Sequence, residues 1–164
     1  MLRLAQEIDR LNRAVAGVVR WLALAMALIQ FAIVIGRHVF GVNAIWAQES
    51  VLYLHAALFM LAAGYTLLVD GHVRVDIFHA RMAPRWQRRV DILGHLLLLM
   101  PMVAALAWWS WPSVRNSWAI LEGPISVGGI GAVFLLKSLI PAFCLLVGLQ
   151  GLACLIRLIA EREG

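Results

Sequence analysis

The sequence has few charged residues and almost no cysteine. Only 14% of its 164 residues are Asp, Glu, Lys or Arg, whereas soluble domains average about a quarter. With a mean hydropathy of +0.86, this composition excludes an ordinary soluble domain and indicates a membrane protein. The two cysteines, Cys144 and Cys154, fall in one apolar run at a spacing that does not bring them together on a helix, so we expect no disulfide.

Apolar runs are long enough for four membrane crossings, since each crossing takes about 20 helical residues. They cover Ala14 to Gly36, Ser50 to Val69, Ile92 to Trp111 and Gly131 to Ile156. The first run is longer than the apolar part of a signal peptide and lacks a small-residue cleavage site, so we expect it to be retained. We therefore predict an all-α membrane protein in which residues 1–164 form a single four-helix transmembrane domain, with short interfacial helices between the spans.

Motifs for catalysis or nucleic-acid binding are missing. The sequence shows no nucleophile beside a base, no glycine-rich phosphate loop and no paired catalytic carboxylates, so we predict that it is not an enzyme. Thirteen of the 14 basic residues are arginine, but they flank apolar spans. Membrane topology explains them better than nucleic acid does.

Arginines are distributed unequally between the two sides of the predicted spans. The N-terminal segment, the loop between the second and third spans, and the C-terminal tail hold eleven, whereas the other two loops hold only Arg37 and Arg115. Because positive residues accumulate in cytoplasmic loops, we predict that both termini and the middle loop are cytoplasmic.

The middle loop, DGHVRVDIFHARMAPRWQRR, contains more than topology requires. Gly71 suits a left-handed turn where the second helix ends, and Asp76 could begin a short interfacial helix that ends before Pro84. We hypothesise that an extended turn containing Arg74 and Asp76 fixes the angle between the second and third helices. The alternative is a solvated, positively charged loop.

Some polar residues lie in or next to the spans, where they need partners. The Glu49 carboxylate could either interact favourably with the positive, N-terminal end of the second helix or contact a partner. Lys137 could extend to the surface, bind a partner protein or pair with Glu122. Small residues at 62–64, Gly148 and Gly151 would let helices approach closely, and Pro101 and Pro141 would bend theirs.

Histidines offer two further possibilities. His55 and His95 could hold a haem between two helices. Their different depths argue against this, so we favour two hydrogen-bonded interhelical histidines over a haem site. His72, Asp76 and His79 share one helical face and mimic a metal site. Because such spacing arises easily by chance, we predict no metal and no cofactor.

Three stretches resemble the small integral-membrane (DctQ-like) subunit of tripartite ATP-independent periplasmic (TRAP) transporters. They are WAQESVLYLHAALFMLAAGYTLLVDGHVRVDIFHARMAP, LLLLMPMVAALAWWSW and FLLKSLIPAFCLLVGLQGL. The resemblance extends from about Trp21 to Arg157. Its most specific parts are Trp46 with Glu49, the block Gly71-His72-Val73-Arg74-Val75-Asp76, and Lys137-Ser138-Leu139-Ile140-Pro141.

The resemblance implies a multi-pass protein of the bacterial inner membrane that is a scaffold for a much larger membrane subunit. That large TRAP subunit would carry sodium and an organic acid or similar solute by an elevator motion, and a periplasmic substrate-binding protein would deliver the solute. We also consider a haem-binding anchor of a respiratory complex and an autonomous small exporter. An elevator needs a fixed frame, and four spans anchored by arginine and tryptophan can provide one.

Overall fold

The computed structural model describes residues 2–72, 79–124 and 126–160, which are almost entirely helical. The elements in chain order are α1 (Leu2–Phe40), α2 (Ile45–Leu68), a 3-10 turn (His79–Arg81), α3 (Pro84–Leu93), a π-helical segment (Gly94–Leu99), α4 (Met100–Ala119) and α5 (Val133–Ala160). Four helices are long and apolar enough to cross a membrane, because α3, the π segment and α4 form one helix, Pro84–Ala119. The predicted all-α membrane fold is confirmed for the described residues.

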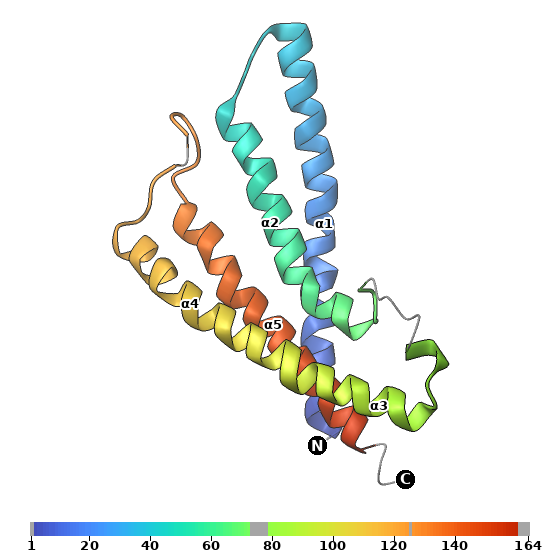
Figure 1. Ribbon diagram of the computed structural model, residues 1–164. Coiled ribbons are helices and arrows are strands. Elements are labelled where there is room, and N and C mark those ends of the chain that lie inside the picture. The colour runs from blue at the N-terminus through green and yellow to red at the C-terminus, as the bar shows by residue number, and fades with distance from the viewer. Residues whose placement is uncertain (1, 73–78, 125, 161–164) are drawn as a thin grey trace.

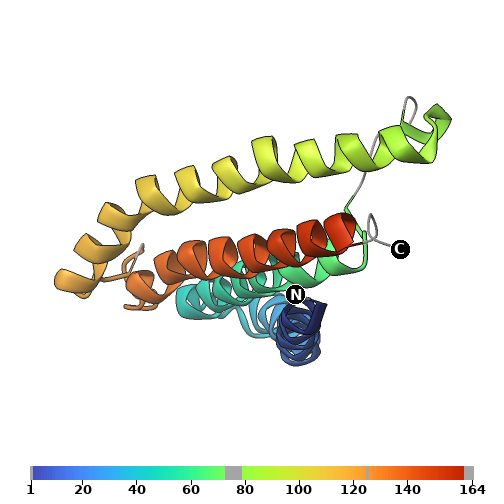
Figure 2. The same cartoon turned by 90° about the horizontal axis from the view of Figure 1, so that it is seen from below.

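Helix α5 lies at the centre of the arrangement. It contacts α1, α2 and α4, while α1 and α2 form a hairpin. Figure 2 shows α5 between the long α3–α4 helix and the α1–α2 pair. The central position follows from composition, because α5 combines a nearly continuous apolar sequence with glycines that admit close neighbours.

Two apolar clusters hold the helices together, and both include α5. Ala63 of α2 and Val103 of α4 pack against Cys144 and Val147. Nearer the termini, α5 packs on α1 through a second cluster made of Ala5, Ile8 and Ala153. Both cysteines are free thiols.

Glycines in α5 permit the close approach of the α3–α4 helix. A Cβ on Gly151 would lie 2.7 Å from Leu99 Cδ2, and one on Gly148 would lie 3.4 Å from Val103 Cγ1. The expectation that these glycines mark close helix contacts is therefore confirmed.

The third membrane helix is longer than the apolar run alone indicates. It begins at Pro84 rather than near residue 92, and its π segment ends just before Pro101. Proline lacks an N–H and its ring displaces the carbonyl four residues earlier, which explains why the preceding turns are widened. The first and second helices also begin well before the predicted spans, at Leu2 and Ile45, and the fourth runs on to Ala160. Charged flanking residues continue these helices because helical hydrogen bonds do not end where the apolar sequence does.

The end of α2 differs from the prediction at one residue. Asp70, with φ 51°, adopts the left-handed conformation assigned to Gly71. The N–H of Gly71 donates to Thr66 O (2.8 Å) and that of Asp70 to Leu67 O (3.3 Å), which is the Schellman pattern. Aspartate tolerates this conformation better than most residues. The expected interfacial helix begins at Asp76, which lies outside the described residues; among the described residues just before Pro84, the structure shows the 3-10 turn His79–Arg81.

Arg74 and Asp76 lie outside the described residues, so the hypothesis that they form a hinge remains a prediction. His72 is described and exposed. The first turn of α1, the last turn of α5 and α3 lie at one end of the molecule (Figure 1). The loops at 41–44 and 120–132 lie at the opposite end. This arrangement agrees with the predicted common side for both termini, while the cytoplasmic assignment stays a prediction.

Candidate functional site

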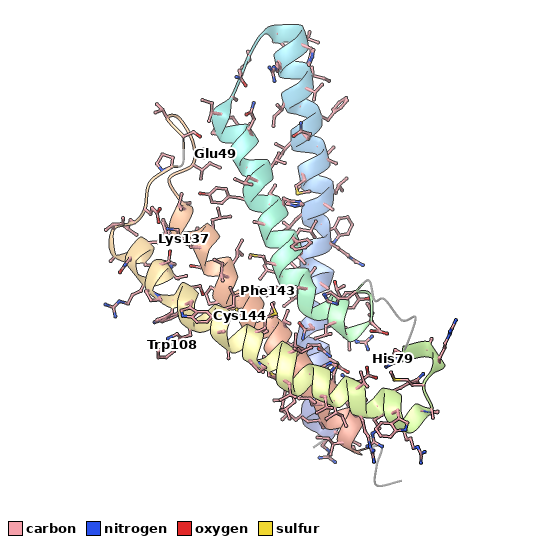
Figure 3. All side chains as sticks on the ribbon, viewed as in Figure 1. Glu49, His79, Trp108, Lys137, Phe143 and Cys144 are labelled. Carbon is pink, nitrogen blue, oxygen red and sulfur yellow. The ribbon has the colours of Figure 1, made fainter. Side chains whose placement is uncertain are left out.

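Polar side chains gather in two places at opposite ends of the molecule. We call one the terminal network (Asp9, Asn12, Gln150 and Arg157) and the other the loop cluster (Glu49, Tyr53, Ser117, Glu122 and Lys137, with the backbone of residues 126–130). Figure 3 places Glu49 and Lys137 near the 120–132 loop and His79 at the far end. Each group joins segments that are distant in sequence.

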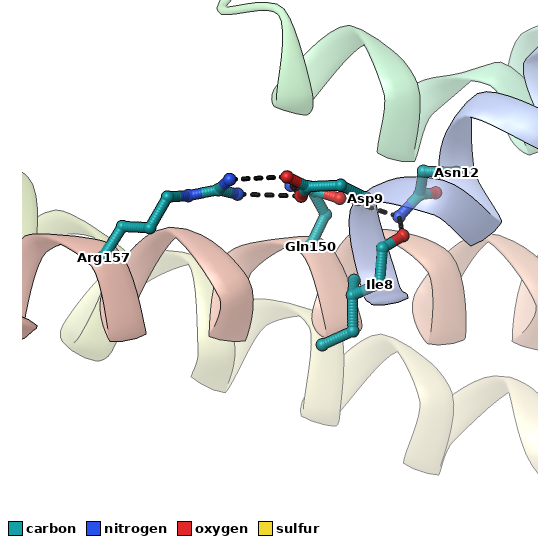
Figure 4. A network of polar contacts seen from close by, with 5 residues as sticks. All are labelled: Ile8, Asp9, Asn12, Gln150 and Arg157. Atoms are coloured by element: carbon teal, nitrogen blue, oxygen red, sulfur yellow. Dashed lines mark hydrogen bonds and ion pairs between the residues drawn. The ribbon is translucent and has the colours of Figure 1, made fainter. Parts of the chain in front are cut away.

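The terminal network joins α1 to α5 (Figure 4). Arg157 donates from both terminal nitrogens to Asp9, with Nη1 to Oδ2 at 2.6 Å and Nη2 to Oδ1 at 2.9 Å. Gln150 Nε2 donates to Asp9 Oδ1 (3.0 Å), and Asn12 Nδ2 donates to Gln150 Oε1 (2.8 Å). Such two-pronged arginine–carboxylate geometry fixes both distance and orientation.

Close helix packing encloses this network. Asn12 and Gln150 are completely buried. A Cβ on Gly64 of α2 would lie 2.1 Å from Asn12 Oδ1 and 3.1 Å from Leu146 O. Only glycine therefore fits where α1, α2 and α5 meet.

Glu49 anchors the loop between α4 and α5 in the loop cluster. Its Oε2 accepts from the N–H of Ile130 at 2.6 Å, and its Oε1 accepts from the N–H of Ser126 at 3.2 Å. The carboxylate is buried and approaches Gly129 so closely that a Cβ there would lie 2.2 Å from Oε2. This contact with another segment of the same chain was not among the two roles considered for Glu49, which were the helix end and a partner.

Tyr53 holds the same loop one helical turn along α2. Its hydroxyl donates to Ile130 O at 3.4 Å. Because Glu49 accepts from the N–H of Ile130, both backbone groups of that residue are bonded to α2. The loop is thereby fixed on the α2 side.

Lys137 pairs with Glu122, which was one of its three predicted alternatives. The Nζ of Lys137 lies 2.5 Å from Glu122 Oε2, and Ser117 Oγ donates to the same oxygen at 2.6 Å. The hydrogen bond from Lys137, followed by that from Ser117, lowers the pKa of the Glu122 carboxyl. The group is thus held ionised as the chain leaves α4.

Tryptophan and proline near the loop cluster have different surroundings. Trp118 Nε1 donates to Ser138 Oγ at 2.8 Å, and its ring meets Phe134 edge to face. Trp46 is mostly exposed, so this chain alone does not cover its indole. Pro141 lies inside α5, where it removes one backbone hydrogen bond.

The histidines do not form the predicted interhelical pair. His55 is exposed and stacks near Phe59 on its own helix. His95 Nδ1 lies 2.8 Å from Asp91 O, also on its own helix, and its ring interacts with Cys154 of α5. The expected hydrogen bond between them is wrong, because the exposed His55 ring lies beside Phe59 while the His95 ring interacts with Asp91 and Cys154. In the described part of the chain, no group of three or more His, Cys, Asp or Glu is arranged to hold a metal.

The end of α3 is fastened to the neighbouring segments. His79 Nε2 lies 3.1 Å from Asp91 Oδ1, and Gln87 donates to His79 O. Arg88 Nε donates to Leu158 O at 2.6 Å. The Arg88 cation therefore interacts favourably with the negative, C-terminal end of the α5 helix dipole.

Comparison with protein families identifies the chain. Residues 26–161 match the family described as "Tripartite ATP-independent periplasmic transporters, DctQ component". The chain belongs to the DctQ family. No curated protein sequence matches it significantly.

Family membership defines the chain at a coarse level. It is a small membrane subunit of a TRAP transporter and a multi-pass protein of the inner membrane, which agrees with its four apolar helices. The family is a transporter component, not an enzyme family. This membership favours the transport reading over the respiratory haem anchor.

Sequence reasoning missed the terminal network. Asp9 and Asn12 precede the first predicted span, and Gln150 stands alone as a polar residue within the fourth. A signal was present, because Asp9 and Asn12 are three residues apart and Gln150 and Arg157 are seven apart. Each pair therefore shares one helical face.

Proposed function

We propose that this chain is the fixed frame that holds the large membrane subunit of a TRAP transporter while the large subunit moves its substrate site across the membrane. A periplasmic binding protein would deliver the solute, an organic acid or similar compound, and sodium would drive its uptake. Family membership supports the transporter class. The role as a frame rests on the geometry of this chain.

The observation that carries the proposal is that polar contacts tie different helices together at both ends. Asp9 and Arg157 join α1 to α5. Glu49 joins α2 to the loop that leads into α5. Directional hydrogen bonds in a low-dielectric surrounding oppose sliding of one helix past another. A chain whose helices are tied in this way is suited to hold a moving partner in place and poorly suited to move itself.

Most hydrogen-bonding groups of the buried polar side chains are used within the chain. Gln150 accepts from Asn12 and donates to Asp9, while Glu49 accepts two backbone N–H groups. This use favours a structural role for these residues over binding of a transported ion.

The remaining apolar surface suits lipid or a large partner. Trp108 and Trp109 of α4 are 78% and 77% exposed. Large aromatic residues of this kind commonly anchor interfaces and membrane surfaces. We propose that part of this surface contacts the large subunit.

A covalent linker tests the frame directly. In a chain with Cys144 and Cys154 replaced by Ala, Glu122→Cys and Lys137→Cys are joined by a short bifunctional thiol reagent within the reconstituted transporter. We expect transport to continue after the linker closes, because a frame does not need these segments to separate. The single-cysteine variants treated with the same reagent are the matched controls.

Two results would contradict the proposal. One is transport that stops when the linker closes but continues in the treated single-cysteine controls. The other is uptake by this chain alone in liposomes, which would indicate an autonomous transporter.

A further inference from the structure

A groove of about 320 Å³ lies between α1 and α2, beside the terminal network and lined by none of its four residues. Its charged and polar lining residues are Arg13, Arg20 and Tyr65. Apolar and small residues complete the walls: Ala16, Gly17, Val19, Leu58 and Ala62. The groove thus combines an apolar lining with two positive charges.

Both arginines can serve the same site because of their spacing. Arg13, Gly17 and Arg20 follow at i, i+4 and i+7 on α1, which places them on one face. Helical side chains lean toward the N-terminus of their helix, so both guanidinium groups lean toward the end of the molecule that carries the termini. That end is the predicted cytoplasmic surface, toward which long basic side chains extend.

The guanidinium groups have little else to bind. Arg20 lies over the Trp21 ring, 5.5 Å from its centroid. Neither Arg13 nor Arg20 donates a hydrogen bond to any acceptor in the described segments. The nearby carboxylate of Asp9 is already held at both oxygens by Arg157. Both arginines therefore keep donors for an external anion.

Gly17 keeps the floor of the groove open. A Cβ on this residue would have no atom within 4 Å, so packing against α2 does not explain the glycine. Val19 is buried and Leu58 lines the opposite wall. The open floor leaves room for an alkyl chain beside the helix.

We infer that this groove binds an anionic phospholipid, with its phosphate held by Arg13 and Arg20, the Tyr65 hydroxyl at the same headgroup, and an acyl chain against Gly17 and Leu58. Basic pockets between transmembrane helices on the cytoplasmic side suit such headgroups. An acidic side chain of a partner protein would satisfy the charges, but it would leave the apolar floor unfilled. The combined lining therefore favours a lipid.

Native mass spectrometry of the purified complex with the large subunit tests the charge requirement. The probes are phosphatidylglycerol, phosphatidylcholine with the same acyl chains, and inorganic phosphate. We expect wild type to retain phosphatidylglycerol in preference to phosphatidylcholine, and Arg13→Gln with Arg20→Gln to weaken its binding about tenfold. The matched control, Arg3→Gln with Arg10→Gln, removes equal charge from the same helix outside the groove and should bind normally.

A second variant tests the shape without changing the charge. Gly17→Leu places a side chain on the open floor and should displace the acyl chain while both arginines remain. Val18→Leu, at a neighbouring position that is 70% exposed, is the matched control and should leave lipid binding unchanged. Normal assembly of both variants with the large subunit would show that they fold.

Three outcomes would overturn the inference. In the first, the groove variants and the control variants bind phosphatidylglycerol equally well. In the second, inorganic phosphate competes for the site as effectively as the lipid does. In the third, the arginine variant loses the large subunit while its lipid binding is unchanged. The second would indicate a site for free phosphate. The third would indicate an acidic surface of the partner protein.

Discussion

The terminal network and the loop cluster hold the same bundle in different ways. In the terminal network, side chains from α1 and α5 bond to one another across 138 to 148 residues of sequence. In the loop cluster, the Glu49 side chain binds backbone N–H groups of a loop. The first arrangement fixes the spacing of two helices. The second fixes the path of a loop over the end of a helix.

This difference determines how each end should respond to mutation. The terminal network encloses completely buried amides, so a change there leaves polar groups without partners and without water. The loop cluster lies at the end of the helices, where a released loop can be hydrated. We therefore expect larger losses from changes at the terminal network.

Gly64→Ala should have the largest effect. Its Cβ would lie 2.1 Å from Asn12 Oδ1. Either Asn12 leaves its bond with Gln150 or α1 and α2 separate, at a cost of about 3 kcal/mol in the free energy of unfolding. Thermal unfolding in detergent and recovery of the complex measure this effect. Gly17→Ala is the control, because it meets open space and should be neutral or stabilising. Equal stability of the two variants would contradict the close approach.

Asp9→Asn should rank second. Asparagine keeps an acceptor for Gln150 but removes the charge that faces Arg157, whose side chain is only 33% exposed. Because one partner of a partly buried pair is left uncompensated, we expect a loss of about 2 kcal/mol in the free energy of unfolding. Arg157→Gln in the Asp9→Asn background should restore part of it, which a double-mutant cycle measures. Glu7→Gln, at an exposed pair with Arg10, should change little; if it costs as much as Asp9→Asn, the burial argument is wrong.

Glu49→Gln should have a smaller and more local effect. The amide can still accept one hydrogen bond, but the charge that strengthens the contacts with Ser126 and Ile130 is lost, so we expect about 1.5 kcal/mol. Hydrogen exchange should accelerate at residues 126–130 and remain unchanged near Gln150. Equal acceleration at both ends would show that the two polar groups are coupled and would contradict their independence.

Mild acidification should have the smallest effect of the changes considered, because the contact between Glu122 and Lys137 persists well below neutral pH. The pKa of Glu122 is lowered by Lys137, so its stabilising contact is present above the ordinary carboxyl pKa and is lost only as the pH falls through the lowered value. Hydrogen exchange of the 120–132 loop should therefore be constant between neutral pH and about pH 5, apart from its intrinsic pH dependence. It should accelerate only in stronger acid. A transition near neutral pH that disappears in Glu122→Gln would contradict this assignment.

The sequence was most informative where physical rules are strong. Four apolar runs predicted four membrane helices, and the placement of both termini at one end agrees with the distribution of arginine. The pairing of Lys137 with Glu122 was among the alternatives because the two lie at neighbouring ends of consecutive helices. Helix ends were less accurate, since α1 continues through the charged residues before Ala14.

Contacts between distant segments could not be derived from one sequence. Asp9 is a charged residue at the edge of a span until the fold brings Arg157 to it. Glu49 binds a loop whose position depends on the packing of α4 on α5. The glycine suggested that Gly71 is the left-handed residue at the end of α2. The hydrogen bonds from the N–H groups of Asp70 and Gly71 place the turn one residue earlier, so Asp70 is left-handed instead.

The distance between two spin labels in the working transporter tests the fixed frame most directly. Labels at Val39→Cys near the end of α1 and at Ile120→Cys, which directly follows α4, are at exposed positions. They report whether α1 and α4 move relative to each other. We expect the same distance distribution with and without sodium and the loaded binding protein, whereas the distance of a label pair between this chain and the large subunit should change. A shift of the Val39 to Ile120 distance as large as the shift between subunits would contradict the fixed frame.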